Sequence, residues 1–495
     1  MSVQFAMPVR EDRTVDFIDL GVLTEVVAPD LVEEVIEVAG CRERRRRLLP
    51  ARSVIYVVLG LCLFSSADGF CPPGYRVVLR AMVTRWKPVF TGRVIASGSA
   101  VTRARQRLGA KPLAMLFERV RGPLSGEPAG WSHAFGLLLV AWDGTTVQVA
   151  DSPANGEQFG YHGQRADRCA PGSLRGGAAR GANPLVRVMT LVECGTHAII
   201  DAVFDGAWRA SEHVLARQLI AALRPGMLMI ADANFAGYQL WGLTAASGAQ
   251  LLWRVKKNVV FVPLRTLPDG SYLSLMPPPA DNRRLGYLRS KGRPAIPDAG
   301  HPIRVVEYTV TINTPRGQRT EPFRLITTLL DHRRAPAADL AGIYHQRWQA
   351  ETTYSNVKPR LIGRDTVLRS RTPDGVIQEI YAFLVIYQAL CTLQHRAATT
   401  ENIDPDRISF LVTIRTVRAD LIQYVTPATT ATQRQHEVIT TILEDRLAQR
   451  RSRTSPRQRR PPANKYPSKR RDQPRPSTKA TYNIHIDSQH QGQHA

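Results

Sequence analysis

The chain has 495 residues, of which 43% are hydrophobic, so it has room for roughly two to four folded domains. Its 66 Lys and Arg against 42 Asp and Glu give a formal net charge of +24, which predicts a polyanionic partner. A membrane surface is the weaker candidate, because the longest apolar run, residues 54–64, falls far short of the roughly 20 residues of a membrane span and the N-terminus lacks a secretory signal.

Residues 1–135 have the pattern of a helical DNA-binding domain. Asp30 followed by Glu33 matches a capping box, and apolar residues at helical spacing continue until Gly40 ends the run. A basic stretch, residues 42–47, follows directly and is interrupted by a single Glu. This domain is therefore expected to contribute positive charge of its own.

Two further helices in this domain are a candidate DNA-binding element. Ser99 is a suitable N-cap for a helix over residues 100–108, and Gly109 separates it from a second helix. This pattern is compatible with a helix-turn-helix, in which Arg103 and Arg107 share one face at i and i+4 and contact DNA. The alternative is a solvated basic face of an ordinary helical bundle.

Residues 136–255 show strand patterns. Residues 137–142 form an apolar run that ends at Asp143-Gly144, a turn pair, and alternation follows. Residues 227–231 form a continuous apolar run typical of a buried strand, and the run ends at Asp232. Strands followed by alternating strands and helices predict an α/β domain with a mixed sheet.

The remaining chain divides into four parts that differ in composition and in predicted secondary structure. Residues 256–329 are rich in turns and short β segments, which predicts a β-rich insertion. Residues 330–400 return to a helical pattern, with Pro336 suited to a first helical position, and residues 401–445 continue it. Residues 446–495 carry 13 Lys and Arg against two Asp and are rich in Pro, Gln and Ser. We expect this basic tail to be disordered and to bind phosphates without sequence preference, or to act only as a solubilising extension.

The strongest local pattern lies around Glu351. In a helix, Tyr344, Arg347 and Lys358 fall within a sector of about 60° that also includes this acid. A carboxylate flanked by an aromatic hydroxyl and two cations suits an acid that binds a metal while its neighbours hold phosphates. The alternative is an ordinary surface helix with an Arg–Glu pair. Pro359 disfavours the α conformation of the residue before it, so the helix is expected to end close to Lys358.

The spacing Tyr-x2-Arg-x3-Glu-x6-Lys resembles the signature around the third acidic residue in the insertion element 4 family of bacterial Asp-Asp-Glu (DDE) transposases. Further segments are similar to that family in the same order: Leu49–Arg52, Arg107–Gly109, Trp142–Thr146 continuing to Asp151–Asn155, Val192–Ala198 and Leu228–Phe235. Asp232 follows Asp143 by 89 residues, and Glu351 follows Asp232 by 119. The resemblance spans roughly residues 15–425.

The resemblance implies a ribonuclease-H-like catalytic domain, a mixed α/β sheet flanked by helices. The β-rich insertion, the helical N-terminal domain and the disordered basic tail complete the expected fold. It also implies that Asp143, Asp232 and Glu351 are the catalytic and metal-binding acids. Two Mg²⁺ ions, or Mn²⁺ in their place, would be held by these carboxylates. Asp143 would bridge both ions, and each of the other acids would complete one.

The expected function is that of a DNA transposase. Arg347 and Lys358 are implied to hold the backbone of the transposon end, and Tyr344 to donate a hydrogen bond to a phosphate. The protein would bind terminal inverted repeats, form hairpin ends, and cleave and transfer strands into target DNA as a homodimer. We expect it in the bacterial cytoplasm, on the nucleoid when DNA-bound and away from membranes. The six cysteines, which lack disulfide or zinc spacing, fit a reducing compartment.

Two other functions fit the same residues. One is a catalytically inactive DNA-binding relic of a transposase, and the other is a ribonuclease-H-like nuclease that does not transpose. Single positions also have simpler interpretations, since Asp143 could form a turn and Asp232 could cap the helix that follows its strand. Asp151 and Asn155 are expected to be turn residues rather than ligands.

Overall fold

The computed structural model describes most of the chain between residues 18 and 486. The described residues are 18–45, 47, 49–65, 74–84, 96–126, 129–161, 183–256, 259, 261–293, 295–297, 299–314, 317–346, 361–362, 366–423, 430–448, 453–454, 478–479 and 481–486, with side chains except at 84, 143, 314, 319, 345, 346 and beyond 448. The chain forms two compact units, each assembled from three stretches of sequence. Unit 1 comprises residues 1–132, 140–222 and 348–447, and unit 2 comprises residues 133–139, 223–347 and 448–495.

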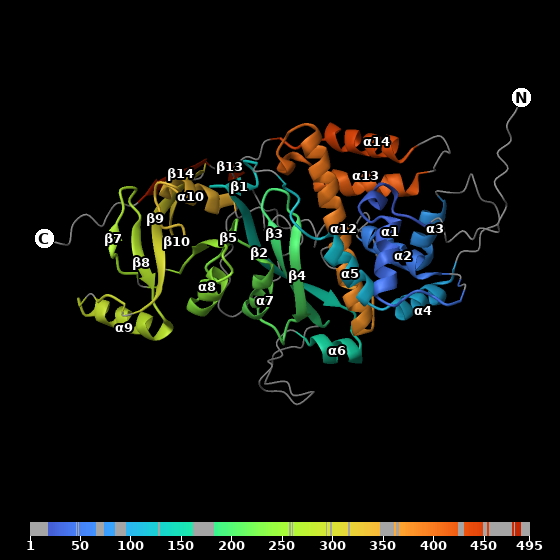
Figure 1. Cartoon of the computed structure of the whole chain (residues 1–495), viewed down its shortest axis with the longest axis horizontal. Coiled ribbons are helices and arrows are strands. Elements are labelled where there is room, and N and C mark those ends of the chain that lie inside the picture. The colour runs from blue at the N-terminus through green and yellow to red at the C-terminus, as the bar shows by residue number, and fades with distance from the viewer. Residues whose placement is uncertain are drawn as a thin grey trace, which may run out of the picture. The chain divides into compact units, whose positions relative to one another are not determined.

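The helical part of unit 1 combines helices from its first stretch, residues 1–132, with helices from its last, residues 348–447 (Figure 1). The helices described there are η2 Gly21–Glu25, α1 Pro29–Val38, α2 Ala51–Leu63, α3 Tyr75–Thr84, α4 Gly98–Leu108, α5 Lys111–Val120, α12 Pro373–Thr400, η6 Pro405–Arg407, α13 Phe410–Ile422 and α14 Ala431–Glu444. α12 packs against α2, α5 and α14. In the described part of the chain it is the one helix long and apolar enough to cross a membrane, but 83% of its most apolar window is buried inside the protein. α12 is therefore the central core helix of this part.

Two helices of unit 1 begin at residues other than those predicted. α1 begins at Pro29, and no side chain caps it. Proline suits the first turn because its missing N–H would have no helical partner there, so Asp30 lies inside the helix and the predicted capping box is wrong. α4 is capped by Ser97 rather than Ser99, because the Ser97 hydroxyl accepts a hydrogen bond from the amide of Ala100 at 3.2 Å.

The strands of unit 1 form an antiparallel meander. They are β2 (Leu137–Val149) from residue 140 onward, β3 Leu185–Glu193 and β4 Ile199–Gly206. A short strand, β11 Val367–Leu368, lies parallel to the end of β2. This part of the unit also contains the helices α6 Pro153–Phe159 and α7 Glu212–Leu219. β2 runs straight through Asp143 and Gly144, and Asp143 pairs with Thr190 of β3. The predicted turn is therefore wrong. Pairing along the whole strand, with β-branched residues on both sides, outweighs the local turn preference of the pair.

Unit 2 contains the start of β2 and the parallel part of the sheet. Its strands are β1 His133–Ala134, β5 Met227–Ala231, β6 Gln250–Arg254, β7 Arg265–Thr266, β8 Tyr272–Met276, β9 His301–Thr314 and β10 Gly317–Thr327, with helices α8 Tyr238–Ala245, α9 Pro279–Ser290 and α10 Ala337–Gln346. β5 and β6 are parallel and are joined through α8. The strand order is β4-β3-β2 in unit 1 and β2-β5-β6-β10-β9-β8-β7 in unit 2. An antiparallel meander followed by a parallel strand–helix–strand pair is the predicted ribonuclease-H-like arrangement.

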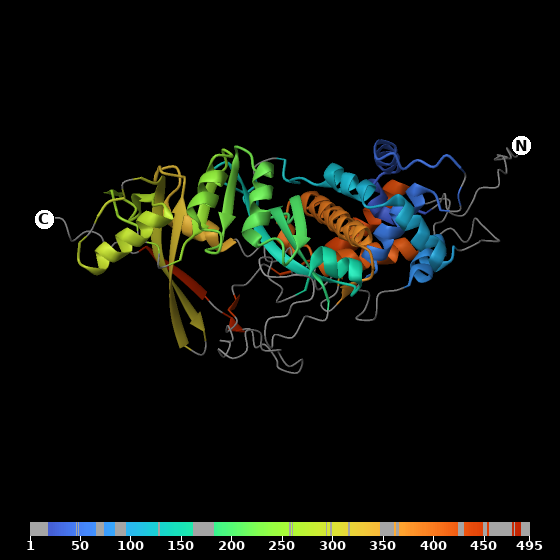
Figure 2. The same cartoon turned by 90° about the horizontal axis from the view of Figure 1, so that it is seen from below.

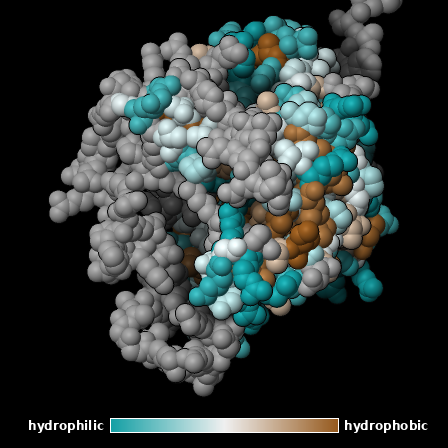
Figure 3. Space-filling view, turned by 90° about the vertical axis from the view of Figure 1, so that its left-hand side faces the viewer, coloured by the Kyte–Doolittle hydropathy of each residue, from teal (hydrophilic) through white to brown (hydrophobic). Residues whose placement is uncertain are grey.

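The chain between β6 and α10 is the expected β-rich insertion, built mainly on the long β9–β10 hairpin. It also contains α9, which the turn-rich sequence did not predict. Three consecutive prolines precede and open this helix, and Pro279 occupies its first position, where proline is tolerated. Figure 3 views the molecule from the side where Figure 1 shows β7 and α9, and apolar groups lie there among hydrophilic ones. The exposed large apolar residues of the described insertion are Leu264, Tyr287 and Ile296.

The basic tail is partly ordered, contrary to the prediction for residues 446–495. Thr481–Ile486 form β14, which pairs antiparallel with residues 308–313 of β9 (Figure 2). A second short pair joins β12 Arg453–Thr454 to β13 Thr478–Lys479. The sequence of β14, Thr-Tyr-Asn-Ile-His-Ile, contains the β-branched and aromatic residues that favour strands and has no charged Lys or Arg. The prediction of disorder rested on the average composition of residues 446–495, and an average does not reveal a short segment that favours a strand.

Candidate active site

Asp143, the first predicted acid, occupies a central position in β2. Its neighbours in the strand, Ala141 and Trp142, are buried, so the backbone that carries the acid is fixed by core residues. The side chain of Asp143 lies outside the described part of the structure. At Gly144, an added Cβ would lie 3.4 Å from the side chain of Glu212, an ordinary van der Waals distance, so α7 lies against this part of β2.

Asp232, the second predicted acid, follows the five wholly buried residues of β5. Its Oδ1 accepts a hydrogen bond from the amide of Asn234 at 2.8 Å, which closes a tight turn after the strand. The next helix, α8, has Gly237 as its N-cap, so Asp232 does not cap it. In the described part of the chain, Oδ2 of Asp232 accepts no hydrogen bond. The half-buried carboxylate thus keeps one oxygen open, as a ligand for a hard cation requires.

The third predicted acid, Glu351, lies outside the described residues, as do Arg347 and Lys358. The helix that leads toward them, α10, is described as far as Gln346. Tyr344 lies on α10 and is 4% exposed. It packs near Tyr308 of β9, whose pKa is raised mainly by burial and further by Tyr344. A phosphate contact by Tyr344 stays a prediction, and it would require the hydroxyl to be uncovered.

The two arginines predicted to contact DNA differ in their surroundings. Arg103 on α4 is exposed and makes no side-chain hydrogen bond to the described residues. Arg107 donates to the carbonyl of Leu49 at 2.8 Å and pairs with Glu43 at 3.4 Å. Its guanidinium is therefore partly used inside the domain, which leaves Arg103 as the more available cation of the pair.

Arg105, which the sequence analysis did not single out, is the buried centre of a polar network. Its Nε donates to Gln378 at 2.7 Å, and its Nη1 donates to the Tyr75 hydroxyl at 2.7 Å. Its Nη2 pairs with Glu379 at 3.1 Å. Burial alone would lower the pKa of Arg105, but the Glu379 carboxylate and Tyr75 reverse this, and the pKa is raised overall. Arg105 therefore remains charged and attaches α4 to α12.

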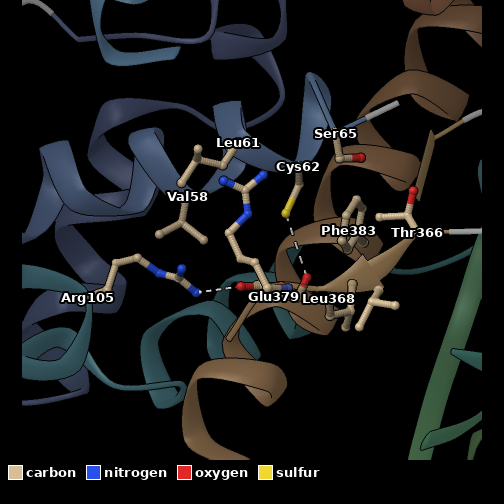
Figure 4. A pocket seen from close by; sticks show the side chains of 11 residues that line it. Val58, Leu61, Cys62, Ser65, Arg105, Thr366, Leu368, Glu379 and Phe383 are labelled. Atoms are coloured by element: carbon tan, nitrogen blue, oxygen red, sulfur yellow. Dashed lines mark hydrogen bonds and ion pairs between the residues drawn. The ribbon is translucent and has the colours of Figure 1, made fainter. Parts of the chain in front are cut away.

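The same network borders a small cavity between α2, α4 and α12 (Figure 4). Its volume is about 20 Å³, enough for one water molecule. Cys62 lies on the wall of the cavity, and burial raises the pKa of its thiol. A mostly apolar space of this size beside a fully paired arginine is part of the packing and has no room for a substrate.

The helix α9 carries a second feature that the sequence analysis missed. Arg283, Arg289, Lys291 and Arg293 are all exposed on it or just after it. Lys291 lies 6.0 Å from the ring of Tyr287, itself 64% exposed. The signal was present in the sequence as the run Asn-Arg-Arg-Leu-Gly-Tyr-Leu-Arg-Ser-Lys-Gly-Arg, but the prolines around it favoured a loop. Clustered exposed cations beside an aromatic ring suit binding to a phosphate backbone.

Asp151 and Asn155, predicted to be turn residues, both have structural partners. Asp151 accepts a hydrogen bond from the hydroxyl of Tyr161 at 2.6 Å. Asn155 is buried in α6, and its Nδ2 donates to the carbonyls of Ala150 and Ser370 at 2.9 Å each. Asn155 is therefore a helix residue that connects two chain segments, rather than the predicted turn residue. Within the described residues, no three His, Cys, Asp or Glu side chains gather as a metal site.

Comparison with known families shows which family the chain belongs to. A model described as "Insertion element 4 transposase N-terminal" matches residues 17–118, and one described as "Transposase DDE domain" matches residues 135–388. The chain belongs to the insertion element 4 family of DDE transposases. The transposase is thus an enzyme of an insertion sequence, and its DDE domain implies dependence on a divalent metal.

Two relatives by sequence agree with this assignment. The transposase is 24% identical over 368 residues to "Transposase InsG for insertion sequence element IS4" of Escherichia coli (strain K12), which covers 74% of each chain. It is 30% identical over 144 residues to "Putative transposase InsZ" of the same organism, which covers 29% of this chain and 44% of the relative. A solved piggyBac transposase synaptic complex with hairpin DNA is similar at 9% identity and a TM-score of 0.41, covering 85% of this chain and 84% of that one.

Proposed function

We propose that the transposase binds the terminal inverted repeats of its element through residues 1–135, pairs two ends as a homodimer and cuts them with two Mg²⁺ ions held by Asp143, Asp232 and Glu351. The observation that carries this proposal is Asp232, which follows a wholly buried strand and whose Oδ2 accepts no hydrogen bond from the described residues. Such an acid on a rigid sheet, inside a match to a DDE domain, suits a metal ligand better than a structural role.

The residues suggest a separate role in cleavage for the metal ions, the acids and the cations. Divalent ions, when bound, would activate the attacking oxygen and stabilise the leaving oxygen of the phosphodiester. Asp143 would be held in place by the paired backbone of β2, and Asp232 by its turn with Asn234. Arg347 and Lys358 would hold the phosphates of the transposon end, with Arg103 and the cations of α9 adding contacts farther along the DNA. The net charge of +24 favours such contacts along a polyanion.

Cleavage of DNA ends tests the proposal. Wild type, Asp143→Asn, Asp232→Asn and Glu351→Gln would be compared on a duplex that carries the element's inverted repeat, with Mg²⁺ and separately with Mn²⁺. Each variant is expected to lose more activity than the roughly 10–100-fold cost of losing an outer-shell partner of a metal. Glu437→Gln, at an exposed acid on α14, serves as the control and should cut at the wild-type rate.

The possible results separate the three functions. Equal cutting by all of the acid variants would contradict the metal site. If wild type and variants all bind the ends but none cuts, the protein is an inactive relic. If wild type cuts but never joins an end to target DNA, it is a nuclease without transposition. Sedimentation of the complex with and without end DNA tests the homodimer.

A further inference from the structure

The insertion contains a fully buried arginine, Arg304 of β9, with an exposed fraction of 0%. Its Nε donates to the hydroxyl of Ser271 at 2.8 Å, and its Nη1 donates to the carbonyls of Ala335 at 2.6 Å and Leu329 at 3.3 Å. Its Nη2 pairs with the carboxylate of Asp269. A buried guanidinium is tolerated only when its donors are satisfied in this way.

Asp269 connects this arginine to the start of α10. It lies in the turn between β7 and β8, and its Oδ2 also accepts a hydrogen bond from the amide of Ala337, the first residue of α10, at 2.9 Å. Burial raises the pKa of Asp269, but hydrogen bonds from Ser271 and the charge of Arg304 outweigh it, so the pKa is lowered overall. A carboxylate at this place satisfies an amide that has no helical partner and interacts favourably with the helix dipole.

The position of α10 in the chain gives this contact its importance. The helix is ten residues long, and the chain reaches Arg347 one residue after its end and Glu351 four residues later. Catalytic groups must be held to within about 0.5 Å of their working position, so the element that leads to them has to be anchored. The first turn of α10 is held by Asp269, which accepts the hydrogen bond from the amide of Ala337.

We propose that Asp269 and Arg304 are positioning residues for the cleavage reaction: Arg304 fixes Asp269, and Asp269 fixes the first turn of α10, the described helix that precedes Arg347 and Glu351 in the sequence. This inference rests on the proposed catalytic role of Glu351. It gives the insertion a part in catalysis that does not require it to touch DNA.

A matched pair of variants separates positioning from simple stability. Arg304→Met and the double variant Asp269→Ala/Arg304→Met both lack the ion pair. Neither leaves a fully buried charge, because the Asp269 carboxylate that remains in Arg304→Met is 20% exposed, so both are expected to fold. They differ only in the carboxylate that caps α10. We expect Arg304→Met to slow single-turnover cleavage about threefold, and the double variant to slow it about tenfold further with the Kd for end DNA unchanged. Asp269→Asn/Arg304→Met restores a capping oxygen and should recover the rate of Arg304→Met.

Amide hydrogen exchange at residues 337–340 provides a readout that does not depend on cleavage. Exchange should rise in the double variant alone and return to normal with Asn at position 269. The proposal is overturned if amide exchange rises in the double variant but its cleavage rate equals that of Arg304→Met. It is also overturned if the cleavage rate, the end binding and the melting temperature of the double variant all fall together. Wild-type cleavage by Glu351→Gln would instead refute the proposed function, while the exchange result on α10 would stand. Glu437→Gln, at an exposed acid on α14, is the control for all measurements.

Discussion

Arg105 of α4 and Glu379 of α12 form an ion pair of 3.1 Å between Nη2 and Oε1, with side chains only 6% and 7% exposed. Glu379 also accepts hydrogen bonds from the amide of Arg369 and the hydroxyl of Ser370. The pair is therefore the centre of a contact between the N-terminal helices and the core helix α12. Removing one partner leaves a buried charge without compensation, which costs far more than losing a surface pair.

Glu379→Gln is expected to destabilise the protein by about 3 kcal/mol, the lower end of the range for breaking a buried pair. Urea unfolding followed by circular dichroism measures this. The control is Glu37→Gln, because Glu37 and Arg42 form a pair in which both side chains are 70% exposed, and it should change stability by less than about 0.5 kcal/mol. Equal effects of the two substitutions would show that the buried network does not hold α4 to α12.

A pH dependence is expected from His395 of α12. Burial lowers its pKa, and the nearby Glu193 offsets this only in part. The neutral ring is therefore favoured in the folded state, and its stabilising effect is present above about pH 6.5, the unfolded value, and is lost as the pH falls through the lower folded pKa. The melting temperature of wild type should fall between pH 7.5 and pH 5.5 by more than that of His395→Gln. The exposed His436→Gln should behave like wild type, and identical slopes for wild type and His395→Gln would refute the prediction.

The cations of α9 predict a defined salt dependence of DNA binding. Arg283→Gln/Arg289→Gln should weaken binding to duplexes of any sequence and reduce the slope of log K against log salt by about 0.9 for each phosphate that is no longer neutralised. Filter binding or fluorescence anisotropy between low and moderate salt measures the slope. Arg396→Gln on α12 is the control, since that cation already pairs with Glu25 at 3.1 Å. An unchanged slope in the α9 double variant would mean that this helix does not face the DNA.

The pairing of β14 with β9 predicts a role for the end of the tail in solubility. Truncation after residue 480 should leave residues 308–313 of β9 without a partner on that edge, and unpaired edges promote aggregation. Light scattering on warming and hydrogen exchange at residues 308–313 should both increase. Truncation after residue 488 retains β14 and should change neither. If both truncations behave alike, the strand does not protect the edge.

The features that the sequence could predict depend on local patterns. The apolar run at 227–231 and the acid after it became β5 and Asp232, because a continuous run of that length is stable chiefly inside a sheet. The Asp143–Gly144 turn failed because strand pairing with β3, a non-local interaction, decided the conformation. Propensity alone gives no information about such a partner.

Other features could be found only in three dimensions. Arg105 follows Val101 by four residues and precedes Leu108 by three, so its place on an apolar helix face was readable from the sequence. Its partner Glu379 lies 274 residues away in the sequence, so the ion pair could not be predicted from a local pattern. The link from Asp269 to Ala337 likewise joins a turn and a helix that no periodicity connects.

The pairing of β14 has a further consequence for the arginine-rich segment before it. Because Thr481–Ile486 pair with β9, the chain that follows the segment is tied to the sheet of the insertion. A segment anchored at one end can carry its charges only a limited distance from the anchor, and it has less entropy to lose when those charges meet DNA. A single proteolytic cut within residues 455–477 would remove this restraint from the residues before the cut, so nicked and intact protein should bind DNA with different affinity at identical composition.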